Sequence, residues 1–421
     1  MATPRPFSLE WLLAPFSVED FAASVWQQRA RLLTSHGPRH FETLFGFSEF
    51  ERVMEYGQPR PPSIHLASSR ASESTEVPFG SDGRLDMDRI RRYYADGHTI
   101  IINNVQNYAS GVARSLQSMQ ERLSYPVEAN AYMTPPGSQG FKPHYDTHDV
   151  IVAQIEGEKL WRVYGEEAAC PLTQLTNGDP FRRENLPVPE FIRLMAGDVL
   201  YIPRGWIHEA ETDKGSSLHV TFGIHAPAGQ DLLRAAISAL CRVHPEFRQP
   251  LPLGYLRRPI DLSKLTALLE HLTELVRVDG SAASAMSLLE DDFIRRGRSA
   301  GDGEIVASVD ALQSLSLKTR IERKYHLHVR ILTTESGVGL QFSQSLLQAP
   351  ADYREAMQFV LDRVTPFCVE DLPGLDADKQ INLAATLLRD GLVRLAGSGD
   401  AVEEGQSAAR FRVSGAFPEP E

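Results

Sequence analysis

The chain has few cysteines, only three in 421 residues, and they lie far apart. Because Cys170, Cys241 and Cys368 are odd in number and widely spaced, they predict neither a disulfide framework nor a C-x-x-C metal knuckle. The sequence also lacks a charge-free run of about 18 apolar residues, and no apolar stretch follows a basic start at the N-terminus. It therefore predicts neither a membrane span nor a secretory signal, and we expect a cytoplasmic protein.

The chain also has fewer basic than acidic residues. The 43 lysines and arginines stand against 55 acidic residues, which gives a net charge of −12. This balance argues against general attraction to nucleic acid. No internal repeat recurs at a fixed period. What the chain does have is 42% hydrophobic residues over a length that suffices for two or three domains with real cores.

Hydrophobic periodicity changes twice along the chain. Residues 8–56 have mixed helical spacing, whereas short β-type runs separated by Gly/Pro turns begin near residue 99 and predict a sandwich or barrel. After Pro227 the pattern is helical again, and leucines repeat at intervals of three and four residues at Leu265, Leu268, Leu269, Leu272 and Leu275. That stripe either packs within the monomer or forms a helical dimer interface.

The most informative stretch is Phe141-Lys142-Pro143-His144-Tyr145-Asp146, which holds an H-x-D pair. In an extended strand, alternate side chains share a face, so His144 and Asp146 are expected to project toward the same ion. A third ligand is His208, 62 residues beyond Asp146, after a β-type run and a Pro-Arg-Gly turn. Two imidazoles and one carboxylate leave about three octahedral positions open, the arrangement of non-haem Fe(II) oxygen chemistry; zinc favours fewer, tetrahedral ligands.

Other histidines compete for these roles. His148 alternates with His144 and Asp146 on the same predicted face, so it is either a further ligand or a neighbour of the site. His219 and His225 are rivals of His208, although no Pro/Gly turn precedes them. An H-x-D pair alone is also compatible with a satisfied core pair.

Activation of O₂ at such a site needs two electrons, which 2-oxoglutarate supplies while it chelates two open metal positions. Its distal carboxylate then needs a cation at the end of the pocket. Lys159 stands at the start of the strand that follows a tight turn at Glu156 to Glu158, where it can act as a point charge. Arg162 is the competing cation, but strand parity puts it on the opposite face from Lys159.

Together these segments resemble the JmjC-type cupins of the ribosomal oxygenase family. The resemblance is carried by Asn130-Ala131-Tyr132-Met133 through His144-Tyr145-Asp146, by Gln154-Ile155-Glu156-Gly157-Glu158-Lys159-Leu160-Trp161-Arg162, and by Gly197-Asp198 through Pro203-Arg204-Gly205-Trp206-Ile207-His208. It implies an α+β fold with a double-stranded β-helix (cupin/JmjC) core. It also implies dependence on Fe(II), 2-oxoglutarate and O₂, and hydroxylation of a protein side chain.

By motif position, the resemblance assigns roles to seven residues. It makes His144, Asp146 and His208 the catalytic iron ligands and Lys159 the partner of the co-substrate carboxylate. It places three further residues at the co-substrate pocket: Asn130, Tyr132 and Thr221. The chain order that it implies is a helical N-terminal region and loop at 1–98, the catalytic core at 99–227, a helical dimerisation segment at 228–310, a winged-helix-like domain at 311–397, and a disordered tail at 398–421.

The expected partners are a protein or peptide substrate, with ribosomal proteins as the family's candidates, and a second copy of the chain in a homodimer. Nucleic-acid binding by the terminal domain is not expected, because residues 311–400 hold ten basic and eleven acidic side chains. Two alternatives stay open. The same core can oxidise a peptide natural product or small molecule, or it can be a non-catalytic cupin that recognises a partner.

Overall fold

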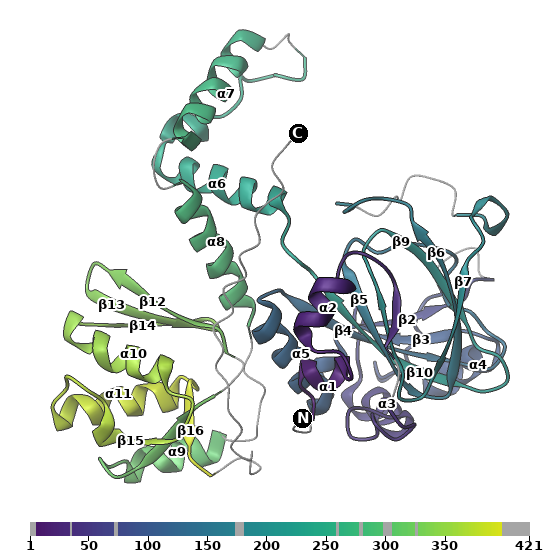
Figure 1. Cartoon of the computed structure of the whole chain (residues 1–421), viewed down its shortest axis with the longest axis horizontal. Coiled ribbons are helices and arrows are strands. Elements are labelled where there is room, and N and C mark those ends of the chain that lie inside the picture. The colour runs from purple at the N-terminus through teal and green to yellow at the C-terminus, as the bar shows by residue number, and fades with distance from the viewer. Residues whose placement is uncertain are drawn as a thin grey trace. The chain divides into compact units, whose positions relative to one another are not determined.

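The structure is a computed structural model that describes residues 6–33, 36–70, 75–172, 181–257, 261–277, 281–297, 305–324 and 327–397. The tail predicted at 398–421 lies outside the described residues. The chain divides into two compact units, residues 1–293 and 294–421 (Figure 1). None of the described helices is both long and apolar enough to cross a membrane.

A seven-stranded antiparallel sheet forms the centre of the first unit. Its strands follow the order β1-β8-β5-β10-β4-β3-β2. They are β1 (Arg31–Leu33), β2 (Ile64–Ala67), β3 (Thr99–Ile102), β4 (Val127–Thr134), β5 (Asp149–Glu156), β8 (Val199–Ile202) and β10 (Ser217–Ile224). The predicted β-type runs from residue 99 onward coincide with the strands that carry most of this sheet.

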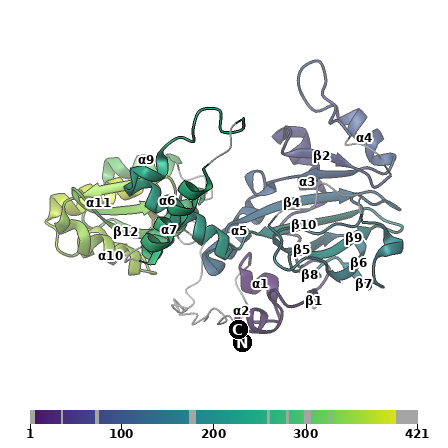
Figure 2. The same cartoon turned by 90° about the horizontal axis from the view of Figure 1, so that it is seen from above.

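A second, three-stranded sheet lies against the first, in the order β7-β6-β9 (Figure 2). Its strands are β6 (Glu158–Glu166), β7 (Glu190–Met195) and β9 (Trp206–Glu211). An apolar cluster joins the two sheets, made of Val150, Val152, Trp161, Val163, Ile192, Leu194, Leu200 and Ile202. The core is thus a two-sheet antiparallel sandwich, as the pattern of short strands predicted.

Helices cover the other face of the large sheet. Alternate strand residues such as Ile151, Val220 and Phe222 pack there into one core with the N-terminal helices. These helices are α1 (Leu9–Leu13), α2 (Val18–Ser24), α3 (Phe47–Arg52), α4 (Met87–Ala95) and α5 (Ser110–Leu123). The N-terminal region is less uniformly helical than predicted, because β1 and β2 come from it and extend both edges of the sheet.

Three successive helices follow β10: α6 (Gly229–Val243), α7 (Leu262–Arg277) and α8 (Ser281–Arg296) (Figure 1). The predicted leucine stripe lies on α7. No side chain of this helix is buried, and Leu262, Leu268 and Leu269 are exposed. Within the described chain, therefore, the apolar face of α7 has little to pack against.

The second unit begins with α9 (Ile305–Ser314) and contains two small antiparallel sheets. One has the order β12-β13-β14 and the other β15-β11-β16. The elements are β11 (Arg320–Arg323), β12 (Val329–Thr334), β13 (Gly337–Phe342), β14 (Ser345–Ala349), α10 (Arg354–Asp362), β15 (Phe367–Cys368), α11 (Ala377–Arg389) and β16 (Val393–Leu395). The hairpin and the two helices predicted here are therefore present, around a separate apolar core.

Candidate metal centre

A short antiparallel bridge brings the two halves of the H-x-D…H pattern together. The amide of His144 donates to the carbonyl of His208 (3.1 Å), and the amide of His208 donates back to the carbonyl of His144 (2.8 Å). In the turn before His208, the amide of Gly205 donates to the carbonyl of Asp146 (2.8 Å). Gly205 has φ +81°, and a Cβ there would overlap the Ala168 carbonyl, so the turn before His208 requires glycine. The H-x-D segment is an isolated bridge rather than the regular strand expected from the sequence.

The side chains of His144, Asp146 and His208 converge, with their ligand atoms all within 4.8 Å of one another. His208 Nε2 lies 3.6 Å from Asp146 Oδ2. Each imidazole contacts a backbone carbonyl through Nδ1: His144 that of Lys142 (2.8 Å) and His208 that of Trp206 (2.9 Å). Because a carbonyl only accepts, Nδ1 carries the hydrogen and the Nε2 lone pair is free for a metal.

Burial favours the neutral, metal-binding form of His208. It lowers the pKa of His208, and the nearby His144 lowers it further, so the His208 imidazole is neutral at neutral pH. Two imidazoles and a carboxylate form the donor set of a facial triad, whose remaining positions stay open to exogenous ligands. The residues present therefore fit a ferrous ion.

The rival histidines lie elsewhere. His148 stacks near His225, with ring centroids 4.6 Å apart, and His219 stacks on Tyr132 at 4.7 Å with nearly parallel rings. Among the described side chains, none of these three joins the group of converging ligand atoms.

Lys159 is a buried cation. Its Nζ donates to Thr134 Oγ1 (2.9 Å), which also accepts from Thr99 Oγ1 (3.1 Å). No carboxylate within the described chain pairs with it, and burial lowers its pKa to about 7. Arg162 lies on the opposite face of β6 and pairs with Glu211, as strand parity predicted. A buried amine without an acidic partner fits the carboxylate of a bound keto acid.

The remaining predicted pocket residues share the inner face of the large sheet. Asn130 pairs with Thr221, and Tyr132 with His219, in the register of β4 and β10. Tyr132 is partly buried; burial and the nearby Asp146 raise the pKa of its hydroxyl. No hydrogen bond of the Thr221 side chain is observed, so of the three it has the weakest structural support.

Sequence reasoning missed His219 and Trp161 as pocket residues. Their rings lie 5.6 Å apart, and Trp161 lies 6.0 Å from the ring of His208. His219 Nδ1 and Trp161 Nε1 are buried polar atoms without a partner in the described chain. Because such atoms are costly to bury unpaired, they are consistent with a polar ligand beside Lys159. Strand alternation could have identified them. His219 lies two residues from Thr221 on β10, and Trp161 lies two residues from Lys159 on β6, so each shares a face with a predicted pocket residue.

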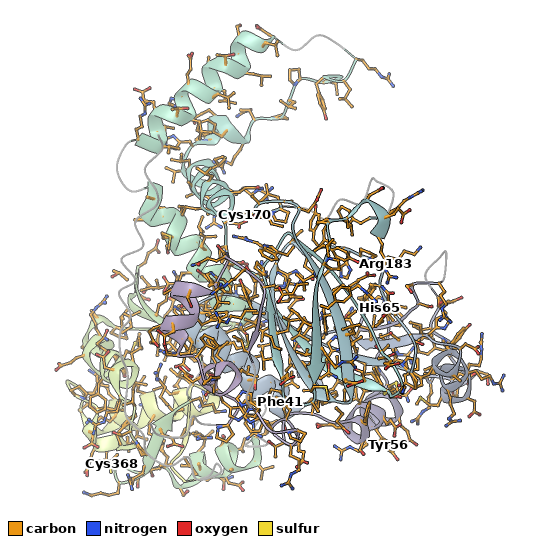
Figure 3. The ribbon with its side chains drawn as sticks, turned by 45° about the vertical axis from the view of Figure 1, so that its right-hand side comes forward. Phe41, Tyr56, His65, Cys170, Arg183 and Cys368 are labelled. Carbon is orange, nitrogen blue, oxygen red and sulfur yellow. The ribbon has the colours of Figure 1, made fainter. Side chains whose placement is uncertain are left out.

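Glu209, which follows His208, anchors a polar network beside the site. Its carboxylate accepts from Tyr164 Oη (2.6 Å), from Gln139 Nε2 (2.6 Å) and from both Nε (2.7 Å) and Nη2 (2.8 Å) of Arg183. Of these residues, Arg183 is labelled in Figure 3. Burial raises its pKa, but these hydrogen bonds outweigh burial, so the pKa of Glu209 is lowered overall. The network ties the segment that carries Arg183 to the loop of Gln139, next to the metal ligands.

Replacing Glu209 with glutamine is expected to destabilise the protein by about 1–3 kcal/mol, because the buried side chain loses the charge that strengthens its hydrogen bonds to Tyr164, Gln139 and the half-exposed Arg183. The Glu209 side chain is 0% exposed. Glu211→Gln is the matched control: it lies two residues along β9, is 34% exposed and pairs with Arg162, so about 0–1 kcal/mol is expected. Urea unfolding measures both. Equal, small losses would show that the network contributes little.

A cavity of about 490 Å³ adjoins the centre. Tyr132 of the inner face lines it, as do Phe141 and Lys142 of the H-x-D segment. The Phe141 ring also lies 5.6 Å from that of His144. The rest of the lining mixes polar and apolar residues: His65, Ser68, Ser69 and Asn103 with Leu66, Ala67 and Ile101. The cavity is large enough to admit an amino-acid side chain.

The chain is similar to several known proteins. The JmjC domain family matches residues 102–232. Ribosomal oxygenase 1 of Gallus gallus is 28% identical over 434 residues, covering 91% of this chain and 71% of that protein. The bifunctional lysine-specific demethylase and histidyl-hydroxylase NO66 of Drosophila erecta is 31% identical over 287 residues, covering 64% of this chain and 43% of that protein.

Among solved structures, YcfD, a ribosomal oxygenase from Escherichia coli in complex with cobalt and 2-oxoglutarate, has a TM-score of 0.53 and 18% identity, covering 91% of this chain and 99% of that one. At that identity the likeness shows a shared fold.

The sandwich, the converging H-x-D…H side chains and the domain match define a JmjC-type cupin oxygenase. The coarse α+β fold predicted from the sequence is confirmed. Within this class, the chain is similar to the ribosomal oxygenases over most of its length, as the resemblance in its motifs indicated.

Proposed function

We propose that this chain is an Fe(II)- and 2-oxoglutarate-dependent oxygenase that hydroxylates a side chain of a protein, with ribosomal proteins as the first substrates to test. The single observation that carries the proposal is the convergence of His144, Asp146 and His208, with the buried, acid-free Lys159 on the strand that pairs with that of His208. The names of the relatives support the protein substrate, since they include ribosomal oxygenase and histidyl-hydroxylase.

In this proposal His144, Asp146 and His208 hold the iron through two Nε2 atoms and a carboxylate. Lys159 binds the distal carboxylate of the co-substrate, and Asn130, Tyr132 and Thr221 line its pocket. When bound, Fe(II) and 2-oxoglutarate supply the oxidation: the keto acid loses CO₂ to give succinate, and one atom of O₂ enters a C–H bond of the substrate. The chain's own share is to position both molecules and exclude water.

The cavity beside Tyr132 and Lys142 is the proposed place of the substrate side chain. Comparing the ribosomal proteins of a deletion strain with those of its parent tests directly whether a ribosomal protein is the substrate. A peptide whose one-oxygen mass gain disappears in the deletion strain is the expected result. Turnover of free amino acids or small molecules, with no effect on peptide pools, would indicate a small-molecule oxygenase. Absence of succinate above background with every component supplied would indicate a non-catalytic binding module.

Binding of 2-oxoglutarate is expected to take up a proton above neutral pH. The pKa of Lys159 is about 7 before the ligand binds, whereas a carboxylate partner stabilises the charged amine and raises that pKa. We expect uptake of nearly one proton at pH 8 and almost none at pH 6, with affinity falling by up to about tenfold per pH unit above 7. Calorimetry of the metal-loaded protein in buffers of different ionisation enthalpy measures this. Equal enthalpies in all buffers at pH 8 would contradict it.

The other regions have proposed roles as well. We propose that residues 228–310 form the homodimer interface, because α7 buries none of its side chains although it carries an apolar stripe. The unit at 311–397 is proposed as a winged-helix-like scaffold, supported by its hairpin and helices. A cytoplasmic location is proposed from the few, widely spaced cysteines. Sedimentation at several concentrations tests the dimer, which the exposed leucines predict to persist in dilute solution.

A further inference from the structure

A second group of metal-binding side chains lies in the helical segment, outside the proposed iron centre. His244 ends α6, Glu246 lies in the following 3₁₀ turn (Pro245–Arg248), and His271 lies on α7. Their ligand atoms all lie within 4.8 Å of one another. Of the His, Cys, Asp and Glu side chains that the structure describes, these form the one other group with this property.

The geometry of the cluster suits a small tetrahedral ion. Glu246 Oε1 lies 3.3 Å from His244 Nδ1 and 3.2 Å from His271 Nε2. Tetrahedral ligands at about 2.1 Å from zinc lie about 3.4 Å from one another, so the donors need little movement to enclose an ion. The Phe247 ring stacks on that of His271, with centroids 5.7 Å apart, and holds the imidazole in this orientation.

The chemistry of the donors selects the ion. Two imidazole nitrogens and one carboxylate oxygen are a zinc donor set, and a water molecule completes a tetrahedron. The side chains are between 29% and 44% exposed, so an ion can reach them. Magnesium and calcium prefer oxygen ligands and are therefore disfavoured.

A metal ion at this position would fix α7, which is otherwise weakly held. Since α7 buries none of its side chains, few contacts within the chain fix it to the end of α6. Glu246 and His271 are 25 residues apart in sequence. An ion held by both would bind the folded arrangement of this loop and stabilise it by its binding free energy.

We propose that His244, Glu246 and His271 bind one Zn²⁺ per chain and thereby fix α7 to the end of α6. This site is independent of the proposed iron centre and of the oxygenase activity.

The test uses the full chain, stripped of metal, with Zn²⁺ as the probe. A variant with both His144→Ala and Asp146→Ala removes two ligands of the iron centre and is expected to bind one Zn²⁺ per chain in calorimetry, with a zinc-dependent rise in Tm. Adding His271→Ala is expected to weaken that binding by at least about tenfold, since even the loss of an outer-shell partner costs as much. Zinc binding is read out directly, so failure of this site and failure of the oxygenase proposal are distinguishable.

Glutamine substitutions provide the matched comparison. In the same double-variant background, Glu246→Gln replaces the ligand carboxylate with a neutral amide of the same size, a much poorer zinc ligand, and is expected to weaken zinc binding as His271→Ala does. Glu270→Gln, an exposed neighbour of His271 on α7, is expected to leave it unchanged. Both side chains are at the surface, so the fold tolerates either change. The proposal would be overturned if the variant with only His144→Ala and Asp146→Ala bound no zinc. It would also be overturned if adding His271→Ala or Glu246→Gln left the zinc affinity unchanged.

Discussion

Asp146→Ala is expected to lower 2-oxoglutarate-dependent succinate formation by more than about a thousandfold, because the ion that supplies several kcal/mol of transition-state stabilisation is no longer held. Asp146 is the only acidic side chain among the three that converge. Without it, only two imidazoles are left to hold a dication, and neither brings a negative charge. Succinate production and anaerobic Fe(II) binding are the measurements.

His148→Ala is the control for that experiment. His148 belongs to the same short segment, but its ring stacks near His225 rather than joining the converging ligands. Its removal is expected to leave Fe(II) affinity within about threefold of the wild type, well under the cost of a lost ligand. Fe(II) binding that survives Asp146→Ala but not His148→Ala would mean that the ligands are wrongly assigned.

Lys159→Met is expected to raise the Kd for 2-oxoglutarate by about 30-fold or more while leaving Fe(II) binding intact. Methionine has a similar length and no charge, so the variant isolates the interaction with the distal carboxylate. Removing one partner of a buried charge pair costs about 2–5 kcal/mol in affinity. Titration of the Mn(II)-loaded protein under argon measures it, and a Kd within about twofold of the wild type would exclude Lys159 as the co-substrate's partner.

The same substitution is expected to stabilise the ligand-free protein. The pKa of Lys159 is about 7 in the folded chain against 10.5 for the ordinary amine. The unfolded state therefore binds more protons between pH 7 and 10.5, and in the wild type this group makes stability rise with pH across that window. Below pH 7 the loss of stability caused by burying the charged Lys159 amine reaches its full size. Lys159→Met removes it, so at pH 7 the variant should be at least about 1 kcal/mol more stable. Urea unfolding at pH 7 and pH 10 tests both statements.

Much of the centre was predictable because it depends on local rules. Strand parity alone put Lys159 and Arg162 on opposite faces of β6, and the turn before His208 distinguished it from His219 and His225. The longer strands were also predictable, since their β-branched residues are bounded by glycine and proline turns.

Other features depend on contacts between distant residues, which local patterns do not encode. β1 is only three residues long and exists because it pairs with β8. The His144–His208 bridge was not foreseen, since nothing in either segment specifies the register. Glu209 had no assigned role from the sequence, because its partners Tyr164, Gln139 and Arg183 come from three separate segments.

The central claim is that one ion and one keto acid are held together by residues from these distant segments. Adding 2-oxoglutarate to the Fe(II)-loaded protein without O₂ tests it most directly, since chelation by the keto acid produces a visible charge-transfer absorption. The wild type should develop this band at one equivalent of each component, His208→Ala should not, and Lys159→Met should need a higher 2-oxoglutarate concentration. No band in the wild type, or an unchanged band in His208→Ala, would contradict the account.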